Sequence, residues 1–432
     1  MVSKAQKKRA NIPDFHQAAL LVGFICWSVP VLAESIDISK VLDGLKNNPL
    51  VEAKHALIQS AQADLGVLES MDSPKVTADA MSPLAGGHNS DQPDYTMRVE
   101  TSLYDWGANR NLIASGTAYL EARGMERDQA VLDLAVGTSD MFHQLASSFL
   151  QLGVFVNARK SLQDLVQMMG RRVEQKVSPQ VDLDIVESRA ALIDVRIEQL
   201  HREVRRHQLS ILRDTEIMVE DPDLSSCALD VEPLDRALVV RALDTSPGLK
   251  MYDASIAALA SEAEALRSEL YPQIVGGYQV DTELNGNNFD QQGYLALRFE
   301  FQTGGNFDSR VAASRARLLE KRALRNEKAE AISQQVSDLI SAYLTSRRLV
   351  GIQKGLADAR ASQKESYLRR FVAGRASWAD VLSADQELVE ARVAQISARV
   401  SACGALSAMA ILVKADQPYR ISESGSPPTW SR

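Results

Sequence analysis

The sequence is poor in the residues that build disulfide frameworks, metal centres and compact catalytic motifs. Its 432 residues include only 3 cysteines, 6 histidines and 14 prolines, and aromatic residues make up 6%. So few cysteines exclude a disulfide-rich secreted scaffold. We find no paired-cysteine or His-Glu-x-x-His spacing, no Walker loop and no Gly-x-Ser-x-Gly element. These absences argue against an enzyme, a cofactor and a metal site.

Acidic residues outnumber basic residues in most of the chain. The formal net charge is -8, although the first 33 residues are basic, with Lys4, Lys7, Lys8 and Arg9 against Asp14. The remainder is therefore more acidic than the whole chain. An acidic surface repels phosphate backbones, so we do not expect nucleic acid as a partner.

Residues 1–33 have the pattern of a secretory signal peptide. A basic segment precedes an apolar run at 18–29, and the small residue Ala33 follows as a cleavage site. A single membrane anchor is the alternative, but the run is short for a membrane span. Cleavage would remove Cys26 and leave Cys227 and Cys403. Both lie near repeat ends, and the sequence leaves open whether they pair.

The chain repeats its order of elements at an offset of 198 residues. Asn48-Pro49 matches Ser246-Pro247, and Asp182-Leu183 matches Asp380-Val381 at this same offset. A duplicated unit predicts internal pseudo-symmetry. We place the first repeat at 34–222 and the second at 223–415. The Ser/Pro-rich residues 416–432 are predicted to form a disordered tail.

Four short segments alternate between apolar and polar residues, as half-buried strands do. They lie at about 75–85, 94–104, 273–283 and 293–302. Roughly ten residues per strand suffice to cross a bilayer when tilted. The polar faces carry Arg98, Glu100, Arg298 and Glu300, which we expect in the lumen of a membrane β-barrel. A half-buried hairpin in a soluble sheet is the alternative.

Each strand pair leads into a long helical hairpin, at about 107–213 and 305–414. No proline lies between 107 and 172, and a coiled-coil seam with 3-4 spacing runs through Phe142, Leu145 and Phe149. Some 65 residues of helix would span on the order of 100 Å. A helix this long must pack on its hairpin partner and on neighbouring subunits.

The two hairpins turn at positions that differ in sequence. Val177 and Ser178 precede a proline in the first turn, and Gly374 and Arg375 form the second. Asp380 follows the second turn, and Asp182 holds the matching place in the first. Such an aspartate can complement the dipole at a helix N-terminus. Alternatively, copies of it can line a constriction when subunits assemble around an axis.

Two motifs make the chain resemble a known family. The segment Leu103-Tyr104-Asp105-Trp106-Gly107-Ala108-Asn109-Arg110 is similar to a strand-to-helix junction, and Gly374 to Ala384 is similar to a hairpin-tip motif. Both belong to the TolC family of outer-membrane efflux proteins. The residues of the junction motif are more similar to the branch of the family that serves type I protein secretion.

The resemblance implies a mainly α fold with a membrane β-barrel in the cell outer membrane. A homotrimer with four strands per protomer would form a 12-stranded barrel in outer-membrane lipid, continuing into an α-helical coiled-coil tunnel through the periplasm. The tips, with Val177, Ser178, Gly374 and Arg375, would dock a periplasmic adaptor. An inner-membrane ABC or proton-driven exporter would supply the energy.

The same resemblance implies a pore constriction at Asp380. Some members carry a second tip aspartate three residues later, where this chain has Ser383. Selectivity at the constriction is therefore expected either to be weaker or to be displaced to Asp385. In the first repeat, Pro179 is present and the glycine is absent, which predicts that the two hairpins differ in flexibility.

A periplasmic coiled-coil adaptor or scaffold is the rival interpretation. Adaptors have one hairpin, flanked by β-barrel and lipoyl-like segments. This chain has two hairpins and no such segments. An outer-membrane exit duct without chemistry of its own is therefore the favoured function. The sequence names neither the cargo, protein or small molecule, nor the inner-membrane transporter.

Overall fold

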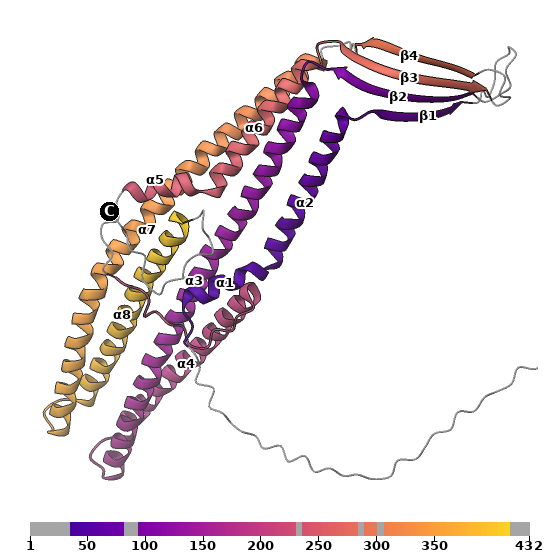
Figure 1. The fold of residues 1–432 in the computed structure, drawn as a ribbon. Helices are drawn as coiled ribbons and strands as arrows, with labels where there is room; N and C mark the ends of the chain where they lie inside the picture. Colours follow the sequence, from indigo (N-terminus) through magenta and orange to yellow (C-terminus); the bar gives the residue numbers. More distant parts are fainter. Residues whose placement is uncertain (1–34, 82–93, 230–235, 284–288, 300–305, 415–432) are drawn as a thin grey trace, which may run out of the picture. The chain divides into compact units, whose positions relative to one another are not determined.

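The computed structural model describes residues 35–81, 94–229, 236–283, 289–299 and 306–414 (Figure 1). The predicted signal peptide (1–33) and tail (416–432) lie outside the described residues. So do Glu300 and the strand ends predicted at 82–85 and 300–302. The described residues form one unit.

The elements follow the duplicated order expected from the sequence. The first repeat contains α1 (Ile38–Asp43), η1 (Gly44–Asn47), α2 (Pro49–Glu69), η2 (Ser70–Asp72), β1 (Lys75–Met81), β2 (Asp94–Tyr104), α3 (Ala108–Glu174) and α4 (Gln180–Thr215). The second contains α5 (Arg236–Thr245), α6 (Pro247–Ser268), β3 (Gln273–Glu283), β4 (Phe289–Arg298), α7 (Asn306–Val372) and α8 (Trp378–Val413).

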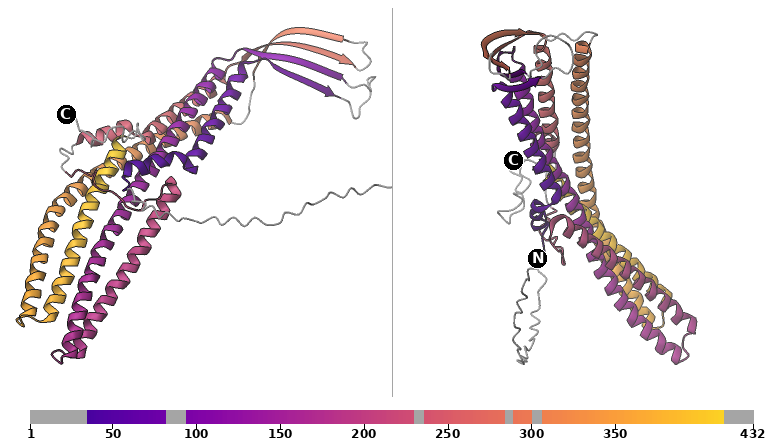
Figure 2. Two further views of the ribbon diagram at one scale, coloured as in Figure 1. Left: turned by 60° about the horizontal axis from the view of Figure 1, so that its bottom comes forward. Right: turned by 90° about the vertical axis from the view of Figure 1, so that its right-hand side faces the viewer.

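The four strands form one antiparallel sheet in the order β1-β2-β3-β4. The β2–β3 pair joins the two repeats, with Arg98 opposite Gln279. β4 begins at Phe289 rather than at 293, because its ladder with β3 continues through Asp281–Asp290 and Thr282–Phe289. One sheet therefore contains both copies of the strand pair (Figure 2).

Apolar spacing in the sequence predicts one continuous helix at 38–71 and another at 234–270, before each strand pair. The structure breaks both of them. The break falls at Asn48-Pro49 and at Ser246-Pro247. The side chain of Asn48 accepts a hydrogen bond from the Leu50 amide, and that of Ser246 from the Leu249 amide. A polar N-cap followed by proline begins a new helix. Both repeats therefore have a short helix followed by a longer one.

α3 and α7 each contain 67 residues, which corresponds to about 100 Å at 1.5 Å per residue. Their return helices, α4 and α8, contain 36 residues each and cover only part of that length. Towards the sheet, α2 and α6 pack against α3, and α6 also packs against α7 (Figures 1 and 2). The parts of α3 and α7 that the return helices leave uncovered are thus covered by α2 and α6.

α8 lies at the centre of the packing, because it contacts both α3 and α7. It is long and apolar enough to cross a membrane, but half of its most apolar window is buried inside the protein. Its residues enter all four apolar clusters along the helices, for example Val381, Val400, Met409 and Leu412. The apolar character of α8 is therefore that of a core helix.

Candidate functional site

The strand register gathers the predicted lumen residues on one face of the sheet. Arg298 Nη2 lies 3.1 Å from the Glu100 carboxylate, and Arg98 Nε lies 3.9 Å from it. The Tyr294 hydroxyl donates a hydrogen bond to the same carboxylate. Thr96, Gln279 and Asp281 continue this hydrogen-bonded row towards the other end of the strands. Such a face can bind water and ions but not lipid tails.

The opposite face of the sheet is apolar and exposed. Leu295 and Leu297 are 77% and 70% exposed, and Val76 and Met97 are more than half exposed. Contiguous apolar surface of this kind is unfavourable in water and marks a membrane or protein contact. The sheet thus separates one polar from one apolar environment.

The junction between β2 and α3 is held by its own side chains. Asp105 accepts hydrogen bonds from the amides of Gly107 at 3.0 Å and Asn109 at 2.7 Å. Trp106 and Gly107 have φ values of 59° and 85°, which turn the chain sharply. The Trp106 indole donates to the carbonyl of Pro272, in the second repeat, at 3.0 Å. The junction motif therefore ties the two repeats together where the sheet meets the helices.

The two hairpin turns have the same backbone conformation despite their different sequences. Lys176 and Gly374, which match at the 198-residue offset, have φ values of 57° and 71°. The Val177 amide donates to Arg172 at 2.8 Å, and the Arg375 amide donates to Arg370 at the same distance. The tip residues Val177, Gly374 and Arg375 are exposed, and Ser178 is half-buried. A lysine thus adopts the left-handed conformation that glycine adopts in the other turn.

Asp380 forms a capping box at the start of α8. Its carboxylate accepts hydrogen bonds from the Ser377 amide at 3.0 Å and from the Ser377 hydroxyl at 2.8 Å. The Asp380 amide in turn donates to the Ser377 hydroxyl at 3.2 Å. In the protomer, Asp380 is therefore a helix cap. α4 begins at Gln180, and its N-cap residue Pro179 offers no side-chain cap, although Asp182 lies in the first turn.

Asp385 is buried, 5% exposed, and links three helices. Its Oδ1 lies 2.5 Å from the Lys364 Nζ on α7, and this ammonium also donates to the Ser161 hydroxyl on α3 at 2.8 Å. Within the protomer, Asp385 is therefore paired between packed helices, and it also lines an open cavity between α3, α4 and α8. The sequence did not single out Lys364 or Ser161, because nothing local shows that three separate helices bring them together.

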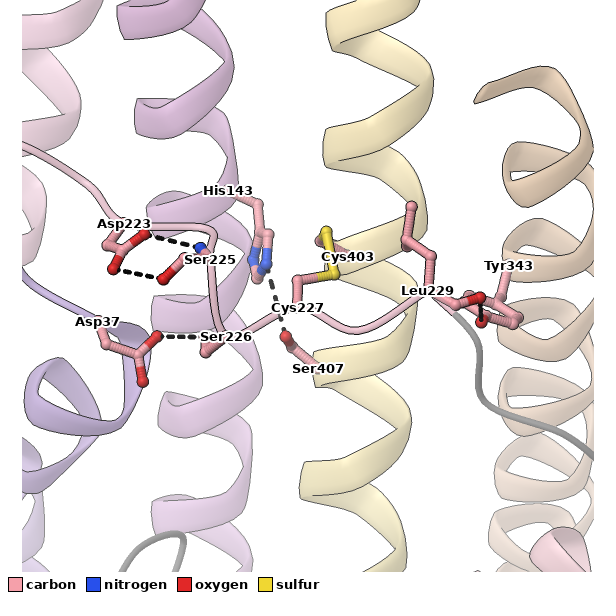
Figure 3. Close-up of a disulfide and its surroundings, with 10 residues drawn as sticks. All are labelled: Asp37, His143, Asp223, Ser225, Ser226, Cys227, Leu229, Tyr343, Cys403 and Ser407. Atoms are coloured by element: carbon pink, nitrogen blue, oxygen red, sulfur yellow. Dashed lines mark hydrogen bonds between the residues drawn. A yellow bond between two sulfur atoms is a disulfide. The ribbon is translucent and has the colours of Figure 1, made fainter. Parts of the chain in front are cut away.

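The segment between α4 and α5 crosses the helices and carries a disulfide bond, whose formation the sequence left undecided. Cys227 in this segment is bonded to Cys403 on α8 (Figure 3). The Ser226 hydroxyl beside it donates to Asp37 at 2.7 Å. Further along, the carbonyl of Leu229 accepts a hydrogen bond from the buried Tyr343 on α7 at 2.7 Å. The segment is therefore fastened on several sides.

His143 on α3 is buried next to this disulfide (Figure 3). Its Nδ1 lies 2.7 Å from the Ser139 carbonyl, so this nitrogen carries the proton, and its Nε2 lies 3.5 Å from the Ser407 hydroxyl. Burial lowers the pKa of His143, an effect that the hydrogen bond to Ser139 and the nearby Asp140 and Asp37 oppose. The ring is therefore a neutral part of the helix packing.

The described residues contain no group of three or more His, Cys, Asp or Glu side chains that could hold a metal ion. Several polar groups of the described sheet and hairpins are instead engaged with one another, as at Glu100, Asp380 and Asp385. What these groups can do is line a passage, cap helices and present exposed turns.

Comparison with known proteins gives the family and the fold. A model of the family described as outer membrane efflux protein matches residues 43–211 and 238–412, which lie in both repeats. No curated protein matches the chain.

Several solved outer-membrane channels share the fold. The chain is 16% identical to the channel OprN, with 87% of this chain and 89% of that chain covered and a TM-score of 0.76. It is 15% identical to VceC of Vibrio cholerae over 87% and 95% of the two chains, with a TM-score of 0.75. For CmeC of Campylobacter jejuni the identity is 13%, the coverage 97% and 96%, and the TM-score 0.75.

These findings confirm the predicted fold class, a mainly helical chain with a membrane sheet and a long coiled coil. They also confirm the predicted function as an outer-membrane channel that extends into the periplasm, and they do not favour the adaptor alternative. Because the family model matches most of both repeats, the chain belongs to the outer membrane efflux protein family.

Proposed function

We propose that three copies of this chain close a 12-stranded barrel and continue it as a helical tunnel. The supporting observation is the four-stranded sheet, in which the outer strands β1 and β4 each pair on one side within the described residues. Unpaired strand edges are not tolerated in lipid, so the sheet must pair with further copies. Two copies would give an eight-stranded barrel filled by side chains, whereas three leave a lumen.

The helices of one protomer also expose apolar side chains that neighbouring protomers would cover. Val156, Leu192, Val195 and Ile352 are 49% to 64% exposed. An open, mainly apolar cavity of about 400 Å³ lies beside Leu192, between α3, α4 and α8. Packing of neighbouring hairpins would remove this surface from water, which favours assembly.

In the proposed assembly the polar row around Arg98, Glu100 and Arg298 lines a water-filled lumen. Glu300, which continues the alternation in the sequence, is assigned to the same lumen. The chain acts as a passive duct and catalyses no reaction. Its energy comes from an inner-membrane exporter.

The constriction is assigned to Asp380, because three copies of this exposed carboxylate at the tips would form an anionic ring. Asp385 is the second candidate. It would reach the passage only after Lys364 releases it, since the two side chains are paired in the protomer. A ring of carboxylates would favour cations over anions.

The exposed turns are assigned to the docking of a periplasmic adaptor. Val177, Ser178, Gly374 and Arg375 occupy these turns. The cations Arg171, Lys176, Arg370 and Arg375 are exposed there and form no ion pair in the part of the chain that the structure describes. Exposed turns with unpaired charge are available to a partner, and an adaptor would connect them to the exporter.

The junction motif from Leu103 to Gly107 favours type I protein secretion with an ABC exporter. Small-molecule efflux with a proton-driven exporter is the second candidate, because the matching family is described as outer membrane efflux protein. Deletion of each candidate exporter, followed by assay of secreted protein and of drug tolerance, separates the two.

The membrane assignment is tested by two substitutions on the same strand. Leu295→Arg places a charge on the apolar face, at a cost of about 2–4 kcal/mol near the bilayer midplane. It should reduce the oligomer recovered from outer membranes at least fivefold. Gln292→Arg, on the polar face, should leave this yield unchanged. Equal yields for the two variants would contradict the assignment of the faces.

A further inference from the structure

The segment between α4 and α5 acts as a strap across several helices. We define the strap as residues 216–229, from the end of α4 to the last described residue before α5. It carries Cys227, whose partner Cys403 lies 176 residues later in α8. Figure 3 shows the strap passing from the side of α3, across α8, towards Tyr343 on α7.

Hydrogen bonds fasten the strap to three other parts of the protein. The Ile36 amide donates to Asp221 at 3.0 Å, so the start of the first repeat lies along the strap. Gln208 of α4 donates to the carbonyl of Val219 at 2.9 Å. The buried Tyr343 of α7 donates to Leu229. Each of these attachments can break and re-form, whereas the attachment to α8 is covalent.

The packing around Cys403 makes this covalent attachment effective. Cys403 is fully buried, and it belongs to an apolar cluster with Phe142 and Leu145 of α3 and Val219 and Leu224 of the strap. At about 1.5 Å per residue, Cys403 lies roughly 38 Å along α8 from the turn at Trp378. The bond therefore fixes α8 far from its tip and leaves the tip without a covalent attachment to the strap.

We infer that the Cys227–Cys403 bond is a covalent clamp. It is formed by a disulfide-bearing thiol oxidoreductase in the compartment to which the chain is exported. The clamp holds α8 against the strap near Cys403, while the part of the α7–α8 hairpin closer to its tip is held by noncovalent contacts. This role does not depend on the cargo or on the adaptor.

The chemistry is a transfer of two electrons from the chain to the oxidoreductase. The Cys227 thiolate attacks the oxidoreductase disulfide, which forms a mixed disulfide and releases one oxidoreductase thiolate. The Cys403 thiolate then attacks the Cys227 sulfur, closes the internal bond and releases the second oxidoreductase thiolate. The two protons lost by the chain thiols end on the reduced oxidoreductase.

The burial of the two sulfurs sets the order of these steps. Cys227 is half-buried between the exposed residues Ser226 and Ala228, whereas Cys403 is fully buried. An oxidoreductase therefore cannot reach Cys403 once α8 has packed. Cys227 is the residue that first meets the oxidoreductase, and Cys403 then closes the bond from within the chain.

The first experiment counts thiols in the assembled full chain from outer membranes. Alkylation in denaturant should label neither Cys227 nor Cys403 without reductant, and both after reduction. In cells, Cys403→Ser should leave Cys227 in a mixed disulfide with an oxidoreductase, detected on a non-reducing gel. Labelling of both thiols without reductant would show that the bond does not form and would overturn the inference.

The second experiment tests the clamp by amide hydrogen exchange in Cys227→Ala, Cys403→Ala and the double variant. Since one bond needs both sulfurs, the double variant should behave like either single variant. Exchange in the strap and in α8 around Cys403 should be at least tenfold faster, with the tip at 374–380 unchanged. Ser226→Ala, which removes a hydrogen bond from the same turn, is the control and should change exchange less than threefold. Native exchange rates in the double variant would refute the clamp.

Discussion

The two helical hairpins have the same backbone arrangement but are held in place by different contacts. Both combine a 67-residue helix with a 36-residue return helix, and both turn through a left-handed residue. On α8, Asp385 and Cys403 are buried and bonded to other elements. The matching residues on α4 are Glu187 and Arg205, and both are exposed.

The difference follows from where the two return helices pack. α8 lies against both α3 and α7, whereas α4 packs mainly on α3. A helix covered on two sides needs apolar residues, and any charge on it must be paired. Duplication therefore set the backbone of both hairpins, while burial determined which side chains each could carry. This comparison can be tested position by position.

The largest effect is expected from breaking the buried ion pair of the second hairpin. Lys364→Met leaves the Asp385 carboxylate buried and unpaired, which should cost about 3 kcal/mol of unfolding free energy. The double variant Lys364→Met/Asp385→Leu should recover most of that loss, since it removes both charges. Glu187→Gln, at the exposed matching position of α4, should stay within about 0.5 kcal/mol. Urea unfolding in detergent measures all three, and equal values for Lys364→Met and Glu187→Gln would refute the comparison.

A pH dependence is expected where the first hairpin meets α8, at the buried His143. Burial lowers its pKa in the folded protein, so the unfolded chain takes up the proton first as the pH falls. The contribution of His143 to the unfolding free energy is therefore fully present above the ordinary histidine pKa of about 6.5. It declines below that pH, by at most about 1.4 kcal/mol per pH unit for one proton.

The non-titrating variant His143→Asn isolates this effect, since its amide can still donate to Ser139. Unfolding curves for both proteins between about pH 7.5 and 5.5 span the ordinary histidine pKa. The difference between their unfolding free energies should shrink as the pH falls. A constant difference would show that His143 does not titrate on unfolding.

The sheet was predictable from sequence because its signal is local. Alternation at Arg98, Glu100 and Arg298 fixes a common face, and antiparallel pairing then brings the three side chains together. The helix breaks at Asn48-Pro49 and Ser246-Pro247 had a visible signal in the cap-proline pairs, but apolar periodicity across them predicted continuous helices. Periodicity does not register a change of helix axis.

The ties of α8 could not be predicted, because they depend on which helices lie beside each other. Lys364, Asp385 and Ser161 lie on three helices, and their meeting depends on how far each helix slides along the next. The pairing of Cys227 with Cys403, 176 residues apart, could not be predicted for the same reason. Local patterns give the elements of this protein, whereas the connections that distinguish its two hairpins arise from tertiary packing.

A smaller effect is expected at the N-cap of α8, which α4 lacks. Ser377→Ala removes the hydroxyl that bonds the Asp380 amide and carboxylate, and should cost about 1 kcal/mol. Ser377→Thr keeps the hydroxyl and should lose only a few tenths of a kcal/mol. Thermal unfolding of the solubilised protein gives both values. If alanine and threonine are equivalent, the capping box adds nothing to the stability of this hairpin.

The smallest effect is expected at the turns, where the two hairpins use different residues in one conformation. A side chain in the left-handed region costs roughly 1–2 kcal/mol, but replacing glycine also recovers about 0.5–1 kcal/mol of unfolded-chain entropy. No atom lies within 4 Å of a Cβ built at Gly374, so packing adds nothing there. Gly374→Lys should therefore lose about 0.5 kcal/mol, and Lys176→Gly should gain a similar amount. Opposite signs in the two exchanges would show that the turns are equivalent in backbone and differ only in residue. The same sign in both would mean that one turn depends on contacts beyond its own backbone, and the equivalence of the tips would then fail.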